Sequence, residues 1–232
     1  MPTIVVTGAT GAIGRRTVLG LVALPATRVV AFVRDPGKAA DLAAAGATLH
    51  RGSFEDAASL RAALAGANTL VLITAGGTLA DQATAAIDAA RAAGVRKVVR
   101  VSSLKASVDG PTDATRQDGR AEAHLRASGL THVILRGHCF MQNLLWSAGP
   151  LRAAGTLHTG SGDGKIGRID SRDIADAAVA AATADTWDGQ TLELTGPAAL
   201  DDAAVAAAGV ERAGGAQGAG APEQVLHEAV AA

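Results

Sequence analysis

The chain alternates short runs of β-branched and aliphatic residues with longer Ala-, Leu- and Arg-rich segments of helical period. The strand-like runs are 3–7, 28–33, 47–51, 68–74, 97–102, 131–136 and 191–195. Asp56 stands near the start of one helical segment and Gly66 follows its end, as helix boundaries prefer. This alternation predicts an α/β fold, with a doubly wound, mostly parallel sheet covered by helices on both faces.

Three glycines separate the first expected strand from the first expected helix. Gly8, Gly11 and Gly14 lie at three-residue spacing in the stretch VTGATGAIG. Glycines at such positions let the backbone turn tightly and approach a pyrophosphate, whose charge lies at the helix N-terminus. The spacing alone is a weak signal, but its place inside a β-α-β unit favours a dinucleotide site over a turn without a ligand. The expected fold is therefore Rossmann-type.

The end of the second expected strand indicates which dinucleotide would bind. Folds that bind NAD usually carry an acidic residue here for the ribose 2′-hydroxyl. In the segment AFVRDP, Arg34 instead offers a guanidinium to a 2′-phosphate, and we expect Asp35 to turn away. Arg15, at the start of the first helix, would add a second positive charge. NADP(H) is the predicted cofactor, and the alternative for Arg34 is a solvated strand end.

We expect residues 1–232 to form a single NAD(P)-binding Rossmann domain, since one core can serve a chain of this length. Its core would cover about 1–136 together with 171–196. A small C-terminal lobe, about 137–170 and 197–232, would cover the substrate.

The regular alternation ends after Arg136. A helix is expected over about 140–153, followed by a glycine-rich segment that predicts a loop or hairpin. The Ala- and Gly-rich tail beyond Pro197 predicts two short helices around a flexible connection. These segments make up the expected lobe.

Charge and cysteine content exclude several classes of protein. The formal net charge of −1 gives no electrostatic footprint for nucleic acid or an anionic membrane. One Cys cannot form an intrachain disulfide, no apolar run approaches the roughly 20 residues that cross a bilayer, and no signal-peptide pattern precedes the first strand. His132 and His138 are not at metal-ligand spacing with a carboxylate. We expect a cytoplasmic monomer or homodimer without a metal, which acts on a small molecule.

Several segments, taken in order, resemble the NmrA-like branch of the atypical short-chain dehydrogenase/reductase family. They are VTGATGAIG, AFVRDP, RGSFED, HLRASGLTHVILR, FMQNLL, GDGKIGRIDSRDIADAA and LELTGPAAL, within roughly residues 3–200. The ordered set is far more specific than any single motif. The members that look most similar are the NADPH-dependent quinone, azo-dye and triphenylmethane reductases.

The resemblance implies cofactor contacts at the carboxyl ends of the strands, where open α/β sheets bind ligands. The implied residues are Gly8, Thr10, Gly11, Ala12, Ile13 and Gly14 in the first turn, Arg34 for the 2′-phosphate, Ser53 and Phe54 beside the adenine, Thr74, Ala75 and Gly76 after the fourth strand, and Ser102 and Ser103 after the fifth. Together they would follow one edge of the sheet.

The wider family typically uses a Tyr-x-x-x-Lys pair on the helix after the fifth strand, whereas this chain contains no Tyr. Counted back from LRASGL, Ala114 and Asp118 stand at the positions of that pair. The tyrosine gives a proton to a carbonyl oxygen as hydride reaches the carbon, so its loss would leave an alkoxide uncompensated in a simple ketone. Two alternatives stay open: an acceptor electrophilic enough to need little acid help, or another proton donor.

Few side chains are candidates for that donor. His138 follows the sixth strand, where the family's chain passes the nicotinamide, and imidazole titrates near neutral pH. Ser103 could orient a substrate oxygen, and Asp118 is ionised unless it is strongly desolvated. We predict His138 and Ser103 as catalytic residues; the competing interpretation of His138 is a structural residue of the pocket wall. Cys139 is more simply a small packing residue.

The leading hypothesis is an NADPH-dependent oxidoreductase that transfers hydride to an electrophilic, aromatic or conjugated small molecule, such as a quinone, imine or enone. Catalysis would come mainly from positioning donor and acceptor together. One alternative is a non-catalytic regulator that senses NADP(H). Another is an isomerase or cyclase on the same fold in a biosynthetic pathway, with His138 as acid and base. Turnover of NADPH with quinones would distinguish the reductase from the NADP(H)-sensing regulator.

Overall fold

The computed structural model describes residues 1–147, 161 and 163–204. The chain divides into two compact units, each built from two separate segments. The first unit comprises 1–137 and 174–194, and the second comprises 138–173 and 195–232. That the second unit covers the substrate stays a prediction.

The first unit is built on a seven-stranded sheet in the order β3-β2-β1-β4-β5-β6-β8, in which every pairing is parallel. The strands are β1 Thr3–Val6, β2 Arg28–Val33, β3 Thr48–Arg51, β4 Thr69–Leu72, β5 Lys97–Ser103, β6 Thr131–Gly137 and β8 Thr191–Leu194. The strand order reverses between β1 and β4, and open α/β sheets bind ligands at such a point. The predicted Rossmann-type fold is confirmed.

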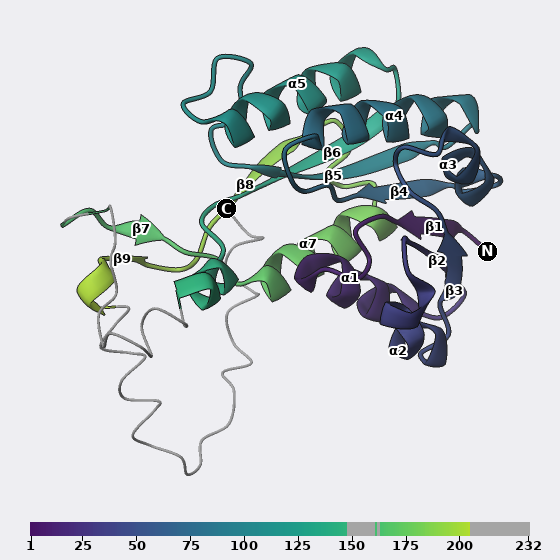
Figure 1. Cartoon of the computed structure of the whole chain (residues 1–232), viewed down its shortest axis with the longest axis horizontal. Helices are drawn as coiled ribbons and strands as arrows, with labels where there is room; N and C mark the ends of the chain where they lie inside the picture. Colours follow the sequence, from purple (N-terminus) through teal and green to yellow (C-terminus); the bar gives the residue numbers. More distant parts are fainter. Residues whose placement is uncertain (148–160, 162, 205–232) are drawn as a thin grey trace, which may run out of the picture. The chain divides into compact units, whose positions relative to one another are not determined.

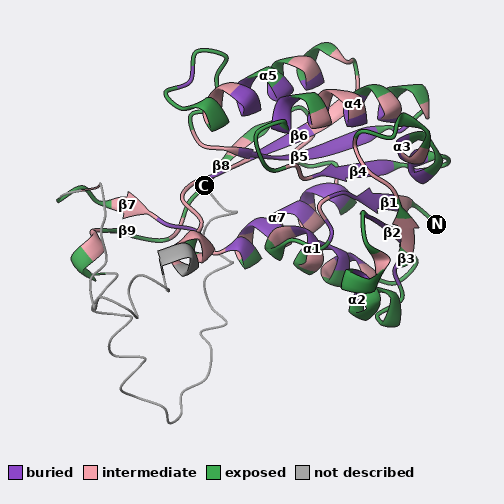
Figure 2. Ribbon diagram, in the orientation of Figure 1, coloured by how far each residue is buried: buried purple, intermediate pink, exposed green. Residues whose placement is uncertain are grey.

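Helices cover both faces of this sheet (Figure 1). They are α1 Ala12–Val22, α2 Ala40–Ala44, α3 Ala57–Leu64, α4 Leu79–Ala92, α5 Asp113–Ala127 and α7 Ser171–Thr183. One core joins the sheet to α1, α2 and α7, and a second joins it to α3, α4 and α5. The central strands are buried on both faces, as Figure 2 shows. Such strands are expected to be almost continuously apolar, as in TLVL of β4.

Local signals fix the ends of the helices on the α3–α5 face. The Asp56 carboxylate accepts hydrogen bonds from Ala58 N and Ser59 N at 3.0 and 3.1 Å, which begins α3. Gly66 follows α3 with φ +72°, a left-handed conformation that favours glycine. Thr112 begins α5 with a capping box shared with Thr115. This cap fixes the start of the helix that carries two buried acidic residues, Asp118 and Glu122.

The second unit differs from its prediction. The described start of the helix expected over about 140–153 is a 3-10 helix, Met141–Ser147, and residues 148–153 lie outside the described residues. The prediction is wrong for these residues: Asn143 N donates to Phe140 O at 3.0 Å, the three-residue spacing of a 3-10 turn, and Met141 N donates to Ile169 O at 2.8 Å. The tail beyond residue 204 also lies outside the described residues.

A short strand of the second unit pairs with a segment far along the chain, while part of the segment expected to form a loop or hairpin lies outside the described residues. The two-residue strand β7 (Ile166–Gly167) pairs antiparallel with β9 (Ala199–Leu200). No helix among the described residues is long and apolar enough to cross a membrane.

Candidate functional site

A pocket of about 290 Å³ in the first unit lies at the carboxyl ends of β1 to β4. It is lined by Gly8, Ala9, Thr10, Gly11, Phe32, Val33, Arg34, Gly52, Ser53, Phe54, Glu55, Ile73, Thr74, Ala75 and Gln82. The lining includes the point between β1 and β4 where the strand order reverses. The pocket is thus where this fold binds ligands.

The turn between β1 and α1 requires two of its three glycines. Gly8 has φ +61°, and a Cβ there would lie 3.0 Å from Ile73 O. A Cβ on Gly14 would lie 2.2 Å from Gly8 O, so only glycine lets α1 approach β1 this closely. Gly11 caps α1 without a side-chain hydrogen bond, which leaves the first-turn amides for an anion. This backbone forms a cradle that suits a pyrophosphate.

The ends of β1 and β4 are joined by side-chain hydrogen bonds. Thr7 Oγ1 donates to Ile73 O at 3.0 Å and accepts from Ile73 N at 2.9 Å. Next along the chain, Thr74 Oγ1 is buried and has no hydrogen-bond partner among the residues that the structure describes. A buried hydroxyl in a native protein usually has a partner, so a polar ligand in this pocket would satisfy it. The residues present therefore fit a dinucleotide.

Charged and aromatic side chains also line the pocket. Phe54 packs edge-on against Phe32, with ring centroids 6.1 Å apart. Arg34 is exposed there, while Asp35 is turned into its own loop, where its carboxylate accepts from Gly37 N at 3.0 Å. Hydrogen bonds from its own backbone amide and from Ser53 lower the pKa of Glu55, so a carboxylate shares the pocket with Arg34.

The pocket contains part of the cofactor set predicted from the sequence. Predicted residues that line it are Gly8, Thr10, Gly11, Arg34, Ser53, Phe54, Thr74 and Ala75. Predicted residues outside its lining are Ala12, Ile13, Gly14, Arg15, Gly76 and Ser102. The lining residues that sequence reasoning missed are Ala9, Phe32, Val33, Gly52, Glu55, Ile73 and Gln82. Glu55 could have been found from its place in RGSFED, directly after two predicted residues.

Two of the predicted residues outside the lining are engaged elsewhere. Arg15 forms an ion pair with Asp41 and donates to Lys38 O at 2.7 Å. Ser102 donates to a buried carboxylate, Glu122, at 2.6 Å. Their contacts with a cofactor stay predictions.

The predicted catalytic residues fall in different units. Ser103 ends β5 in the first unit, and its Oγ is buried without a hydrogen-bond partner among the described residues. His138 is half-buried and is the first residue of the second unit. Cys139 accepts a hydrogen bond from Arg168 Nη1 at 3.3 Å. The catalytic roles of Ser103 and His138 stay predictions.

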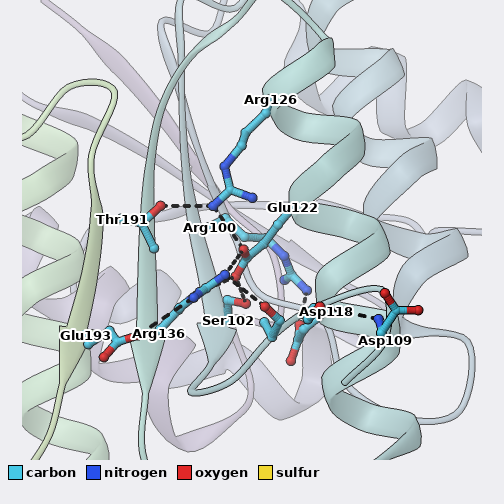
Figure 3. A network of polar contacts seen from close by, with 11 residues as sticks. Arg100, Ser102, Asp109, Asp118, Glu122, Arg126, Arg136, Thr191 and Glu193 are labelled. Carbon is cyan, nitrogen blue, oxygen red and sulfur yellow. Dashed lines mark hydrogen bonds and ion pairs between the residues drawn. The ribbon is translucent and has the colours of Figure 1, made fainter. Parts of the chain in front are cut away.

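A buried carboxylate joins β5, β6 and α5 (Figure 3). Glu122, which is 1% exposed, accepts from Ser102 Oγ, from Arg136 Nε and Nη2 at 2.9 and 2.6 Å, and from Arg126 Nη2 at 3.0 Å. Burial raises the pKa of Glu122, but the hydrogen bonds from Arg136 and Ser102 outweigh burial and bring it below its usual value. Arg136 also donates to Ala106 O at 2.9 Å, which holds the turn after β5.

A second buried ion pair contains Asp118, which by resemblance corresponds to the lysine of the wider family. Asp118, on α5, accepts a hydrogen bond from Arg100 Nη2 at 2.8 Å. Arg100, on β5, is fully buried and also donates to Leu72 O at 3.4 Å. Burial lowers the pKa of Arg100 and raises that of Asp118, because both charged forms lose solvation.

Comparisons with known proteins identify relatives that cover most of this chain. Residues 8–185 match the model of a family described as NAD(P)H-binding. An NAD(P)H azoreductase from Xenophilus azovorans is 37% identical over 210 residues, which cover 88% of this chain and 72% of that one. Quinone oxidoreductase 2 from Escherichia coli (strain K12) is 35% identical over 199 residues, covering 84% and 69% of the two chains.

The solved structures similar to this chain include reductases complexed with NADP(H). An NADPH-dependent quinone oxidoreductase from Escherichia coli, complexed with NADPH, has a TM-score of 0.83 and 34% identity, covering 91% of this chain and 75% of that one. A triphenylmethane reductase from Citrobacter sp., complexed with NADP(H), has a TM-score of 0.78 and 25% identity, covering 85% and 71%. The carboxyl-edge pocket thus lies in a fold shared with reductases that bind nicotinamide dinucleotides.

Proposed function

The chain belongs to the NAD(P)H-binding family, and from this membership we propose that it is an NADPH-dependent reductase of electrophilic aromatic or conjugated small molecules. One observation carries the proposal: a pocket that fits a dinucleotide lies in a chain 37% identical to an azoreductase and 35% identical to a quinone oxidoreductase. Quinones, imines and enones are the expected acceptors.

Different residues of the pocket would bind different parts of the cofactor. The backbone of Gly8 and Gly11 and the start of α1 would hold the pyrophosphate. The Arg34 guanidinium would bind the 2′-phosphate, for which its planar fork is suited. Phe54 would flank the adenine, and the buried Thr74 hydroxyl would gain a polar partner. When bound, NADPH supplies the hydride.

The acceptor class follows from the residues that the chain lacks. It contains no Tyr, so the usual phenolic proton donor is absent from the helix after β5. A quinone or conjugated cation accepts hydride with little acid assistance, since charge is delocalised in the product. The protein's main contribution would be to hold donor and acceptor together in the right geometry.

From the single Cys we also infer a cytoplasmic location, and we further propose a monomeric or homodimeric state. Size-exclusion chromatography with light scattering measures the oligomeric state directly. An assembly larger than a dimer would contradict this inference.

Turnover of NADPH with a small panel of quinones tests the proposed function. The purified protein is mixed with NADPH and each quinone, and the absorbance of the reduced nicotinamide is followed, while calorimetry measures NADPH binding. We expect binding together with quinone-dependent oxidation. Binding without turnover on quinones, imines and conjugated ketones would contradict the reductase and favour the NADP(H)-sensing regulator.

A further inference from the structure

We propose that Glu55 determines the choice of reduced cofactor: its carboxylate accepts a hydrogen bond from the ribose 2′-hydroxyl of NADH and repels the 2′-phosphate of NADPH, so that the protein binds both. The inference rests on the dinucleotide pocket of the proposed function and adds to it a residue that determines specificity. It is carried by the place of Glu55 in the pocket and by the charges around it.

The pairing of β2 with β3 brings Glu55 to the same part of the sheet edge as Arg34. The two strands run parallel with Val33 opposite Arg51, and Gly52 N donates to Val33 O at 3.0 Å, which extends the pairing by one residue. The segments that follow the two strands therefore begin at neighbouring positions. Arg34 comes from one segment and Glu55 from the other, and both line the pocket.

A turn before α3 fixes the position of Glu55. Asp56 N donates to Ser53 O at 3.2 Å, which closes a four-residue turn with Phe54 and Glu55 at its centre. The Asp56 carboxylate caps the first turn of α3 and does not line the pocket. Glu55 is therefore the carboxylate of the segment RGSFED that is available to a ligand in the pocket.

The charged side chains that line the pocket balance each other. Among the lining residues that the structure describes, Arg34 is the one basic side chain and Glu55 the one acidic side chain. The pKa of Glu55 lies below its ordinary value, because its own backbone amide and Ser53 donate hydrogen bonds to the carboxylate, so Glu55 is charged near neutral pH. A 2′-phosphate, with a charge of about −1.5 to −2 at pH 7, is attracted by Arg34 and repelled by Glu55.

Two other charged residues that the sequence places near the ribose are engaged elsewhere. Arg15, expected as a second positive charge, forms an ion pair with Asp41, donates to Lys38 O at 2.7 Å and lies outside the pocket lining. Asp35 follows β2, where folds that bind NAD carry their acidic residue, but its carboxylate is turned into its own loop. The acidic residue left to bind a ribose hydroxyl is thus Glu55.

The two cofactors differ at the group that meets this pair of charges. A carboxylate only accepts hydrogen bonds, so it can bind the 2′-hydroxyl of NADH, which donates, but not a phosphate oxygen, which accepts. The Arg34 guanidinium can donate to either group. We expect the Kd values of the wild type for NADPH and NADH to differ by no more than about 10-fold, because Glu55 offsets much of the preference that Arg34 creates.

Substitution of Glu55 by glutamine tests the inference, since glutamine keeps the size of the side chain and removes its charge. In Glu55→Gln, NADPH should bind about 5-fold more tightly and NADH about 3-fold more weakly, as measured by calorimetry. The matched control is Asp81→Asn, because Asp81 is an exposed carboxylate next to the pocket residue Gln82 but lies outside the lining. The control should change neither Kd. Glu55 is exposed, so its variant should fold, which thermal unfolding checks.

Two fragments of the cofactors give a readout without any hydride transfer. Adenosine 2′,5′-bisphosphate and adenosine 5′-monophosphate differ only in the 2′-phosphate, and Glu55→Gln should shift their Kd values in the same opposite directions. The Arg34→Ala background shows whether Glu55 acts on the ligand itself. There, Glu55→Gln should still tighten the binding of the bisphosphate; loss of that effect would mean that Glu55 acts only by neutralising Arg34, and would overturn the inference.

The remaining outcomes separate this inference from the proposed function. A wild type that prefers NADPH by more than about 10-fold, or a Glu55→Gln variant with the wild-type ratio of Kd values, would overturn the role of Glu55. A wild type that binds both cofactors with the expected shifts in Glu55→Gln, yet never oxidises them, would support that role and reject the reductase. A wild type that binds neither cofactor would reject both.

Discussion

The carboxyl ends of β1 to β4 and the neighbouring β5-α5-β6 region are built by opposite means. The first region is shaped by backbone, with Gly8 in a left-handed conformation and Gly14 where no side chain fits. The second is shaped by buried charged side chains, centred on Glu122 and Asp118. The comparison shows that one sheet can present a backbone cradle that fits a cofactor and, beside it, a network of buried ion pairs.

Removal of a buried charge should have the largest effect on stability. Glu122→Ala leaves the Arg136 guanidinium and the Ser102 hydroxyl without their acceptor, so the free energy of unfolding should fall by about 3–5 kcal/mol. The matched control is Glu193→Ala, because Glu193 faces the same Arg136 at 3.7 Å but is 61% exposed. That control should change stability by about 1 kcal/mol or less. Urea unfolding measures both, and equal losses would contradict the contrast.

Among the substitutions considered, loss of Arg34 should weaken NADPH binding the most. Arg34→Ala removes charge-assisted hydrogen bonds to the 2′-phosphate, which are worth about 1.5–3 kcal/mol, so NADPH should bind about 10- to 100-fold more weakly. NADH lacks that phosphate, and its affinity should change little. Calorimetry with both cofactors measures the ratio; equal weakening would reject the assignment of Arg34.

A methyl group placed in the cradle should have a moderate effect. Gly14→Ala puts a Cβ against the carbonyl of Gly8, so α1 must shift, at about 1–3 kcal/mol of stability and with weaker NADPH binding. Gly77→Ala is the matched control, since a Cβ at that position would meet nothing within 4 Å among the described residues. We expect the control to stay within about 0.5 kcal/mol of the wild type in thermal unfolding. A stable Gly14→Ala variant with unchanged affinity would show that the close approach is not required.

The smallest effect concerns pH. Because the pKa of Glu122 is lowered in the folded state, its charge contributes stability above its unfolded pKa, and that contribution is lost as pH falls through the folded pKa. The stability difference between the wild type and Glu122→Gln should therefore shrink between neutral pH and about pH 3. Urea unfolding at several pH values checks the sign, and a difference that grows on acidification would contradict it.

The backbone-built region was largely predictable because its requirements are local. The glycine spacing and the Arg34 position lie within short segments that carry their own signals. The charged region was not, because its pairs join distant residues: Arg100 with Asp118, and Arg136 with Glu122. In KVVRVS, nothing local distinguishes a buried Arg100 from a solvated one. The 3-10 helix after residue 140 was also missed, and Met141 at its start bonds to residue 169, a contact that no local pattern indicates.

The most direct measurement of the central claim is transfer of deuterium from labelled NADPH to an acceptor. NADPH carrying deuterium at C4 of the nicotinamide, prepared as each of the two diastereomers, is incubated with the protein and a conjugated enone, and the product is analysed by mass spectrometry. We predict that one diastereomer yields a product one mass unit heavier, with the deuterium bound to carbon. An unlabelled product from both, or NADPH that binds and is never consumed, would contradict hydride transfer by this protein.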